Sequence, residues 1–310
     1  MVFGTRVTSG KHGCDCDRGQ SVRLWRRGML VMVKSASDVR ATLDDNCMYD
    51  GLPFTAEMWK YCGKVFTVAR VVNRIYIEKD SVRALPQTLV LESVRCDGSA
   101  HMGCQRLCQL LFKDVWLTPC DTLATPVVTV GQEDTIPVIT TACHGQACVL
   151  RQASTPLPFW QPRQYFADFQ ARNYGLRTFL RMCWYMYFLH RHHTPTNCSV
   201  KTPAQIPSTL GLRVGELVEV RSQGEIAATL DSQGKCRGLY FSHERMGQYC
   251  GKRFRVLQPV EHIIDEDSGR MVTMKDTVYL ADVTCDGTIL RGCPRDCYWL
   301  WREAWLKRVT

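Results

Sequence analysis

Residues 96–108 read Cys-Asp-Gly-Ser-Ala-His-Met-Gly-Cys-Gln-Arg-Leu-Cys, and residues 285–297 read Cys-Asp-Gly-Thr-Ile-Leu-Arg-Gly-Cys-Pro-Arg-Asp-Cys. Each stretch spaces its three cysteines by 8 and then 4 residues, and an earlier cysteine precedes the first by 34 residues in one copy and 35 in the other. Between 96–117 and 285–306, ten of 22 aligned positions are identical. The pattern indicates a duplicated module built around four thiols, which are Cys62, Cys96, Cys104 and Cys108 in one copy and Cys250, Cys285, Cys293 and Cys297 in the other.

Similar phrases upstream of these cysteines extend each copy to about 90–100 residues, a length that can hold one small core. Ala-Thr-Leu-Asp occurs at 41–44 and again at 228–231, and Tyr-Cys-Gly-Lys at 61–64 and 249–252. We therefore predict four parts, namely a flexible basic Cys/His arm (1–27), module 1 (28–118), a connector of loop and amphipathic aromatic helix (119–209) and module 2 (210–310).

The modules read as mainly β with short helices. Strand-like runs are expected at 65–68 and 88–94 in module 1 and at 254–257 and 277–283 in module 2. Short strands separated by turn signals, with one helix near the end, predict two tandem SH3-like small barrels joined by an α-helical connector.

Charge is unevenly distributed along the chain. Of the formal net charge of +9, residues 1–27 carry +4 and residues 119–209 carry +3, which leaves each module close to neutral. A protein that relies on phosphate contacts concentrates Lys and Arg on its folded domains, so this pattern argues against nucleic-acid binding.

The chain has no stretch that reads as a secretory signal or a membrane span. Its most apolar segment, 179–189, contains Arg181 and is too short to cross a bilayer. We expect a soluble, cytoplasmic protein. Seventeen cysteines in a reducing compartment point to metal binding or catalysis rather than to disulfides.

The connector contains an amphipathic helical pattern that starts at Leu176. Its apolar residues recur at helical spacing, namely Phe179, Leu180, Cys183, Trp184, Tyr187 and Phe188. This stripe predicts a helix that packs against one or both modules, with a membrane-surface role as the alternative.

The cysteine spacing predicts a metal site in each module. The Asp-Gly turn after Cys96 folds the loop back, and a helix that begins near Cys104 would place Cys104 and Cys108 on one face. Four thiolates suit tetrahedral zinc, with iron or an iron–sulfur cluster as the alternative. Redox-active thiols and small buried hydrophobic residues are the remaining interpretations. On the helical interpretation, Trp116 and Trp305 extend the same helix and anchor the core.

His101 lies within the module 1 loop, whereas module 2 has Leu290 at the corresponding position. Either His101 is an incidental surface residue, or module 1 alone carries a Cys/His metal site. Cysteine and histidine also cluster at 12–16, 143–148 and 190–198, where each pattern by itself is weak.

Several phrases resemble a family of bacterial proteins without established activity, found near biosynthetic genes. The resembling stretches are Ala-Thr-Leu-Asp at 41–44, Gly-Leu-Pro-Phe at 51–54, Tyr-Cys-Gly-Lys-Val-Phe-Thr-Val at 61–68, Cys-Asp-Gly-Ser-Ala-His-Met-Gly-Cys-Gln at 96–105 and Ala-Trp-Leu-Lys-Arg at 304–308. The resemblance implies the module boundaries and the relevance of the Cys/His loop. The chain departs from the family in lacking a further His and Cys within 70–79.

Three functions follow as hypotheses. The first is a zinc-binding accessory protein of two modules, with metal ligands among the eight repeated cysteines and His101, and with a protein partner bound by the modules or the connector. The second is a metal-dependent enzyme, with iron or zinc in module 1 and a small-molecule substrate. The third is nucleic-acid binding by the basic arm and connector.

Overall fold

The computed structural model describes residues 24–77, 81–120, 145–158, 162–184, 209–266, 268–287, 290 and 292–309. Most of the predicted arm (1–27) lies outside these ranges. So do the cluster at 190–198 and, apart from Cys148, the cysteine and histidine of the cluster at 143–148.

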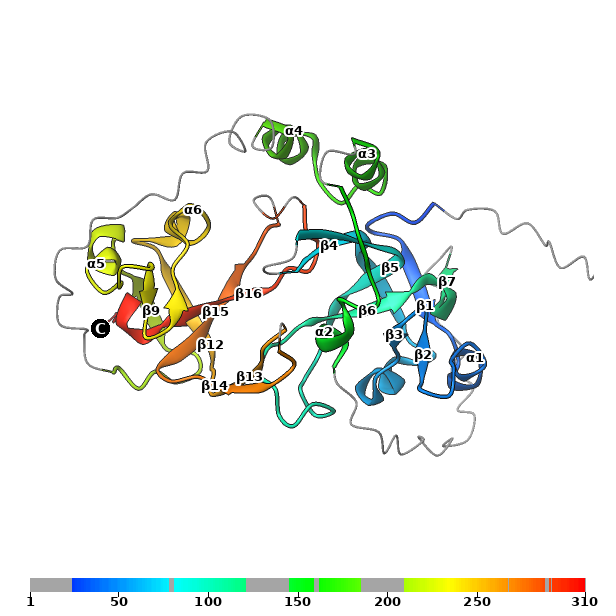
Figure 1. Cartoon of the computed structure of the whole chain (residues 1–310), viewed down its shortest axis with the longest axis horizontal. Helices are drawn as coiled ribbons and strands as arrows, with labels where there is room; N and C mark the ends of the chain where they lie inside the picture. The colour runs from blue at the N-terminus through cyan, green and yellow to red at the C-terminus, as the bar shows by residue number, and fades with distance from the viewer. Residues whose placement is uncertain are drawn as a thin grey trace, which may run out of the picture.

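The chain is mainly β with short helices, as predicted (Figure 1). The first sheet has the strand order β6-β5-β4-β1-β7, with the short strand β8 paired to β5, and its pairs are antiparallel. These strands are β1 (Leu30–Val33), β4 (Val65–Ile77), β5 (Ser81–Arg95), β6 (Gln109–Lys113), β7 (Leu117–Cys120) and β8 (Thr155–Pro156). Around them lie α1 (Ala36–Arg40), β2 (Met48–Tyr49), β3 (Leu52–Pro53) and the 3-10 helices η1 (Ala56–Tyr61) and η2 (Asp114–Trp116).

The second sheet has the order β16-β15-β12-β9-β17 and is also antiparallel. Its strands are β9 (Leu217–Val220), β12 (Arg253–Pro259), β15 (Thr277–Thr284), β16 (Tyr298–Arg302) and β17 (Leu306–Arg308). The other elements are α5 (Gln223–Ala227), β10 (Lys235–Cys236), β11 (Leu239–Tyr240), α6 (His243–Met246), η4 (Gly247–Tyr249), β13 (His262–Ile264), β14 (Met271–Thr273) and η5 (Glu303–Trp305).

The two sheets share one arrangement. In each, the first strand (β1 or β9) lies between the next strand of that sheet along the chain (β4 or β12) and the last strand of the module (β7 or β17). A single 3-10 turn, η2 or η5, precedes the last strand. The SH3-like barrel and the division into four parts remain predictions.

A buried tryptophan in that 3-10 turn anchors each core. Trp116 and Trp305 are both fully buried, and each packs edge-on against a buried phenylalanine with ring centroids 5.0 and 5.2 Å apart. The indole Nε1–H of Trp116 donates to Thr42 Oγ1 over 3.0 Å, and that of Trp305 donates to Thr229 Oγ1 over 3.1 Å. The prediction of core anchors is thus confirmed for both tryptophans.

The predicted helix after Cys104 and Cys293 was wrong. Residues 104–108 and 293–297 are loops that lead into β6 and β16. The physical reason is pairing with the other module, because Gln105 N–H donates to His262 O over 2.9 Å and its side-chain Oε1 accepts from two backbone N–H groups. A segment whose backbone bonds a distant strand cannot also form i to i−4 bonds.

The Asp-Gly turn predicted at the start of each loop is present and requires glycine. Gly98 has φ +78°, and a Cβ there would lie 2.1 Å from the carbonyl oxygen of Cys104. Gly287 has φ +71°, and a Cβ there would lie equally close to the carbonyl of Cys293. Each loop therefore folds back tightly on its own second cysteine, Cys104 or Cys293.

The modules contact each other through these loops in a reciprocal way. Cys104 Sγ accepts from Ile264 N–H over 3.3 Å, and its counterpart Cys293 Sγ accepts from Tyr76 N–H over 3.4 Å. Two arginines at matching loop positions also donate hydrogen bonds to the opposite module. Arg106 donates to the carbonyl oxygen of Ile264, and Arg295 donates to that of Tyr76. The interface is therefore pseudo-symmetric.

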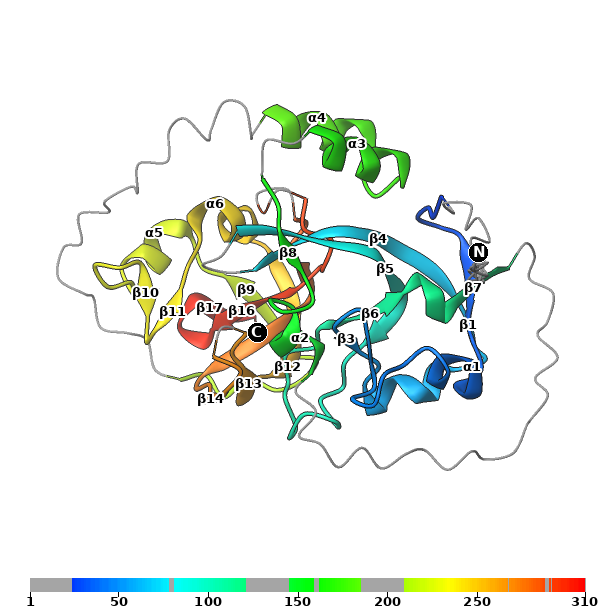
Figure 2. The ribbon, with the colours of Figure 1, turned by 45° about the vertical axis from the view of Figure 1, so that its right-hand side comes forward.

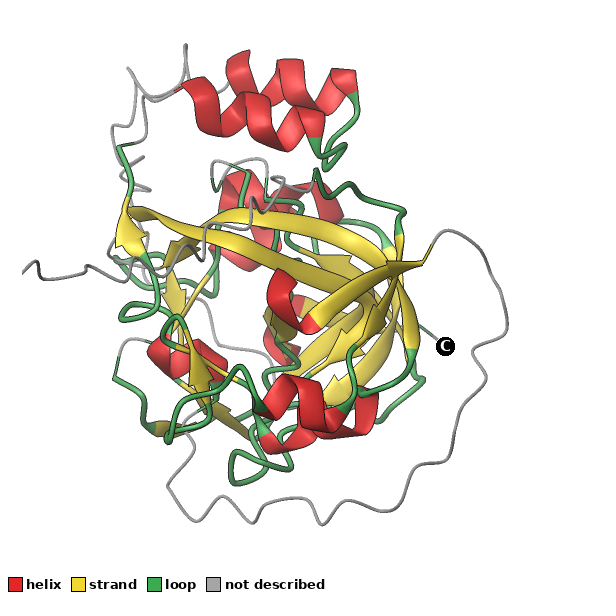
Figure 3. Ribbon diagram, turned by 90° about the vertical axis from the view of Figure 1, so that its right-hand side faces the viewer, coloured by secondary structure: helices red, strands yellow, loops and turns green. Residues whose placement is uncertain are grey.

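The connector contributes the short helix α2 (Gln146–Val149) and two longer helices, α3 (Pro162–Gln170) and α4 (Leu176–Trp184). Helices α3 and α4 lie side by side outside the strands (Figures 1, 2 and 3). Asp168 forms a 2.6 Å ion pair with Arg74 on β4, and Arg181 forms a 2.9 Å pair with Asp286 in the module 2 loop. Met182 is fully buried. The connector thus packs on both modules.

Only part of the predicted apolar stripe packs. Phe179 and Cys183 are half-buried, and the ring centroid of Phe179 lies 5.2 Å from that of Phe169 on α3. Leu176, Leu180 and Trp184 are 60%, 57% and 62% exposed, and Tyr187 and Phe188 lie outside the described residues. Within the part of the chain that is described, no helix has the length and apolar character needed to cross a membrane.

Candidate metal centre

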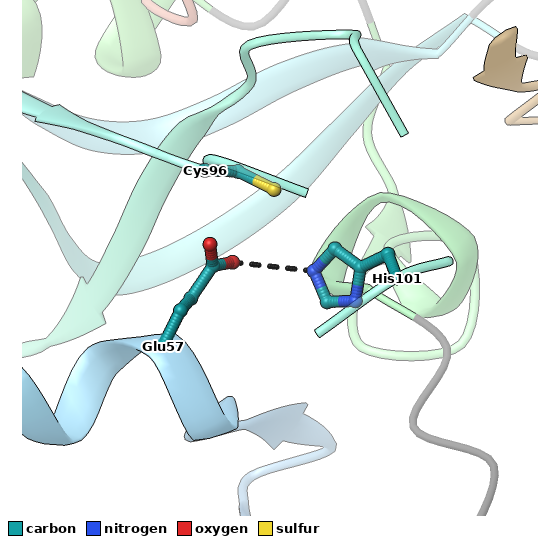
Figure 4. A group of neighbouring side chains, drawn as sticks. All are labelled: Glu57, Cys96 and His101. Atoms are coloured by element: carbon teal, nitrogen blue, oxygen red, sulfur yellow. Dashed lines mark ion pairs between the residues drawn. The ribbon is translucent and has the colours of Figure 1, made fainter. Parts of the chain in front are cut away.

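Three buried side chains of module 1 converge on one point. Glu57 comes from η1, Cys96 from the end of β5 and His101 from the turn that follows, and one ligand atom of each lies within 4.8 Å of the others (Figure 4). They are 5%, 6% and 6% exposed. Carboxylate oxygen, thiolate sulfur and imidazole nitrogen are all zinc ligands, so this group could hold a metal ion.

Local structure holds each donor in place. The Oε1 atom of Glu57 lies 3.2 Å from Nε2 of His101, and its Oε2 accepts from the backbone N–H of Asp97 over 2.9 Å. Gly145 packs against the imidazole, because a Cβ at that position would lie 2.8 Å from Nε2. The ring is therefore confined between the carboxylate and the backbone of the connector.

Electrostatics at the site favour a bound cation. Burial raises the pKa of Cys96, and the charge of Glu57 raises it further. A divalent cation would remove this penalty, because it displaces the thiol proton and compensates the carboxylate. With one thiolate, one carboxylate and a neutral imidazole, the complex would carry no net charge, which suits a buried position.

The corresponding position in module 2 has different chemistry. Burial raises the pKa of Cys285 to about 12, and the nearby Arg245 opposes that shift. Arg245 directly precedes Met246, as Glu57 precedes Met58, and both methionines are buried. Module 2 therefore has Arg and Leu290 in place of the Glu and His of module 1, so a cation stands where a metal ligand would be needed.

The structure gathers only part of the predicted ligand set. Among the described residues, Glu57, Cys96 and His101 are the one group of three or more donors that lie this close together, and the four thiols of neither module form such a group. Cys62 and Cys250 end η1 and η4 and pack against the cores, where burial raises the pKa of Cys62 to about 11. Cys104 and Cys293 bond the opposite module, and Cys108 and Cys297 lie at the starts of β6 and β16.

Sequence reasoning missed Glu57. The span from Phe54 to Cys62 is one residue shorter than the span from Phe241 to Cys250, so the two copies can be aligned in two ways. In one alignment Glu57 matches the exposed Glu244, and in the other it matches Arg245. The change from an acidic to a basic residue in the second alignment, together with His101 and Leu290, is the signal that could have identified the site.

A cavity of about 40 Å³ lies beside the centre, between the modules. Cys96 and His101 form part of its wall, with residues 145–148 of the connector and Ile264, Arg295 and Cys297 of module 2. The metal centre therefore adjoins a space that both modules enclose.

Comparisons with known proteins bring no relative. No family model, no curated protein and no solved structure matches the chain. The family resemblance in the sequence thus stays a prediction.

Proposed function

We propose that this protein is a zinc-binding protein with one metal centre, formed by Glu57, Cys96 and His101 of module 1. The observation that carries the proposal is the convergence of three buried donors of different chemistry within 4.8 Å. A mixed oxygen, sulfur and nitrogen set suits zinc better than an iron–sulfur cluster, which requires thiolates. In this proposal module 2 serves a structural role, because Arg245 occupies the position that corresponds to Glu57.

SH3-like architecture is part of this proposal. The strand order, with the last strand beside the first and a 3-10 turn before it, supports two small barrels that place the loop of residues 96–108 at their interface. On this view the barrels serve to position the metal loop against the cavity.

Metal content of matched variants tests the proposal. We expect the full chain, purified without chelators, to contain about one zinc ion, and Glu57→Gln, Cys96→Ser and His101→Ala each to lose it. Cys285→Ser removes the counterpart of Cys96 in module 2 and serves as the control that keeps zinc. Zinc retained in Glu57→Gln, or lost in Cys285→Ser when both are folded by near-ultraviolet circular dichroism, would contradict the proposal.

A catalytic centre is the second candidate, because three protein donors leave one tetrahedral position and the cavity adjoins the site. Structural zinc sites close their coordination with four protein ligands, whereas catalytic sites keep one position for water or substrate. The metal would then activate a water molecule toward a small substrate. Cobalt(II) substituted for zinc provides the test, since azide should shift its visible absorption bands at an open position. Unchanged bands at saturating azide would favour the structural role.

Partner binding through the connector belongs to the proposal as well. Phe166 on α3 and Leu176, Leu180 and Trp184 on α4 are each more than half exposed. These side chains support an interaction role, since large apolar groups gathered on one helical pair mark contact surfaces.

A further inference from the structure

The cavity between the modules is rich in thiols. Two arginines also line it, and its lining cysteines come from module 1, the connector and module 2: Cys96, Cys104, Cys108, Cys148 and Cys297. Apart from Cys96, these cysteines are not part of the proposed zinc centre. Soft sulfur donors around one enclosed space select soft metal ions.

Cys108 and Cys297 are the matching pair in this cavity. They occupy the same position in the two copies, directly before β6 and β16, and their carbonyl groups accept the same loop bond, from Cys96 N–H and Cys285 N–H respectively, over 2.8 Å. Both are free thiols on the wall of the same cavity of about 40 Å³. One thiol thus comes from each module.

The charged groups beside this pair do not balance. Glu266, whose side chain is 6% exposed, pairs with Arg295 over 2.7 Å and with Arg106 over 3.1 Å. Asp265 lies on the same hairpin, but it is half-buried and accepts hydrogen bonds from Ser268 at the turn. Two arginines against one buried carboxylate leave one positive charge in excess next to the thiols.

We propose that Cys108 and Cys297 together bind one copper(I) ion, held as a linear two-coordinate dithiolate across the module interface. Binding forms two sulfur–copper bonds and releases both thiol protons to solvent, with no change in oxidation state. The resulting complex carries a single negative charge, which the excess charge of Arg106 and Arg295 compensates. The bound ion would thus join one thiol of each module.

The number of available ligands and the charges beside them favour this ion over zinc and over a disulfide. No third His, Cys, Asp or Glu ligand among the described residues joins the two thiols in a compact group, whereas zinc sites in proteins use three or four protein ligands. A disulfide would carry no charge and would leave the excess arginine charge buried without a partner. The proposal does not depend on the zinc centre, because it uses neither Glu57 nor His101.

Competition with a chromogenic copper(I) chelator tests the site on the full chain, purified and handled without oxygen. We expect the wild-type chain to take one equivalent of copper(I) from bicinchoninate, and Cys108→Ser and Cys297→Ser each to lose that equivalent. Cys183→Ser, on α4 and outside the cavity lining, should bind as the wild type does. Glu57→Gln should lose zinc but keep copper(I), so failure of one proposal can be told from failure of the other.

Several outcomes would overturn the proposal. The proposal fails if the wild-type protein takes up no copper(I), or if folded serine variants bind copper(I) as the wild type does. If the serine variants lose trypsin resistance, X-ray absorption of the copper-loaded wild type decides, since two sulfur ligands are expected and a third sulfur or nitrogen ligand would contradict the linear site. A mass lower by two hydrogen atoms in untreated protein, with Cys108 and Cys297 joined, would show a disulfide instead.

Discussion

The sulfur of Cys104 in module 1 accepts a hydrogen bond from the backbone N–H of Ile264 in module 2 over 3.3 Å. Cys293 does the same for Tyr76 of module 1 over 3.4 Å, so the second cysteine of each loop contacts the opposite module. This contact accounts for the presence of the second loop cysteine in both copies, although among the described residues the four thiols of neither module form a compact group. A thiol can accept from a backbone N–H while remaining compatible with an apolar interface.

The ion-pair cluster at the module interface should dominate its stability. Glu266→Gln leaves Arg106 and Arg295 without their shared carboxylate in a buried position. We expect the free energy of unfolding to fall by about 3–5 kcal/mol, because an uncompensated buried charge is costly. Urea denaturation measures the change.

Glu219→Gln is the matched control, since Glu219 pairs with Arg253 on the surface, where the arginine side chain is 61% exposed. Its loss should cost no more than about 1 kcal/mol. Equal effects of the two substitutions would show that the Glu266 cluster does not hold the modules together.

The indole hydrogen bonds of the two cores predict matched losses of stability. Thr229→Val removes the acceptor of Trp305 and leaves a buried N–H without a partner. We expect a loss of about 1–3 kcal/mol, which thermal denaturation can measure. Thr42→Val should act similarly through Trp116, and a neutral result for both would mean that the indole groups find other acceptors.

The capping box at the start of α5 predicts an acid-sensitive contribution. Hydrogen bonds from Ser222 and Lys307 hold the pKa of Glu225 at about 2, below its ordinary value of 4.5. A carboxyl group with a lowered folded pKa stabilises the fold above its unfolded pKa, and this stabilisation is lost as the pH falls from about 4.5 to 2. Glu225→Gln should therefore flatten the pH dependence of the melting temperature in that window.

The matched cap variant is Ser222→Ala, which should lower stability by about 1 kcal/mol at neutral pH. An unchanged pH profile in Glu225→Gln would show that the carboxylate is not bound to the cap in solution.

The apolar face of α4 should tolerate charge. Leu180 is 57% exposed, so Leu180→Asp should change the free energy of unfolding by about 0.5 kcal/mol or less. Met182→Asp on the same helix is the opposite case, because Met182 is fully buried and faces Gly292. A large loss of stability in Leu180→Asp would mean that another part of the chain covers this face.

The strands were predictable where local composition decided them. The valine-rich and aromatic runs at 65–68 and 254–257 lie in β4 and β12, and the Asp-Gly turns form as expected. The loop after Cys104 was not predictable, because a spacing of four residues between thiols fits a helix and a loop equally well. The hydrogen bonds between Gln105 and His262 determine the loop conformation, and these residues lie 157 positions apart in the sequence.

The candidate metal centre was half predicted. Cys96 and His101 stood out because the copies agree at the cysteine and differ at the histidine. Glu57 lies 39 residues before Cys96 on a separate 3-10 helix, and no local pattern connects them. Likewise, the helical stripe of the connector indicated the existence of α4 but not the face it buries, because the packing of Met182 against Gly292 depends on the tertiary fold.

The zinc X-ray absorption spectrum of the full chain tests the central claim most directly, because it counts the sulfur ligands of the bound metal. With Glu57, Cys96 and His101 as ligands, we expect one sulfur atom and otherwise nitrogen and oxygen around zinc, with sulfur near 2.3 Å and the lighter atoms near about 2.0–2.1 Å. A shell of four sulfur atoms would contradict the account and return the site to the four repeated cysteines.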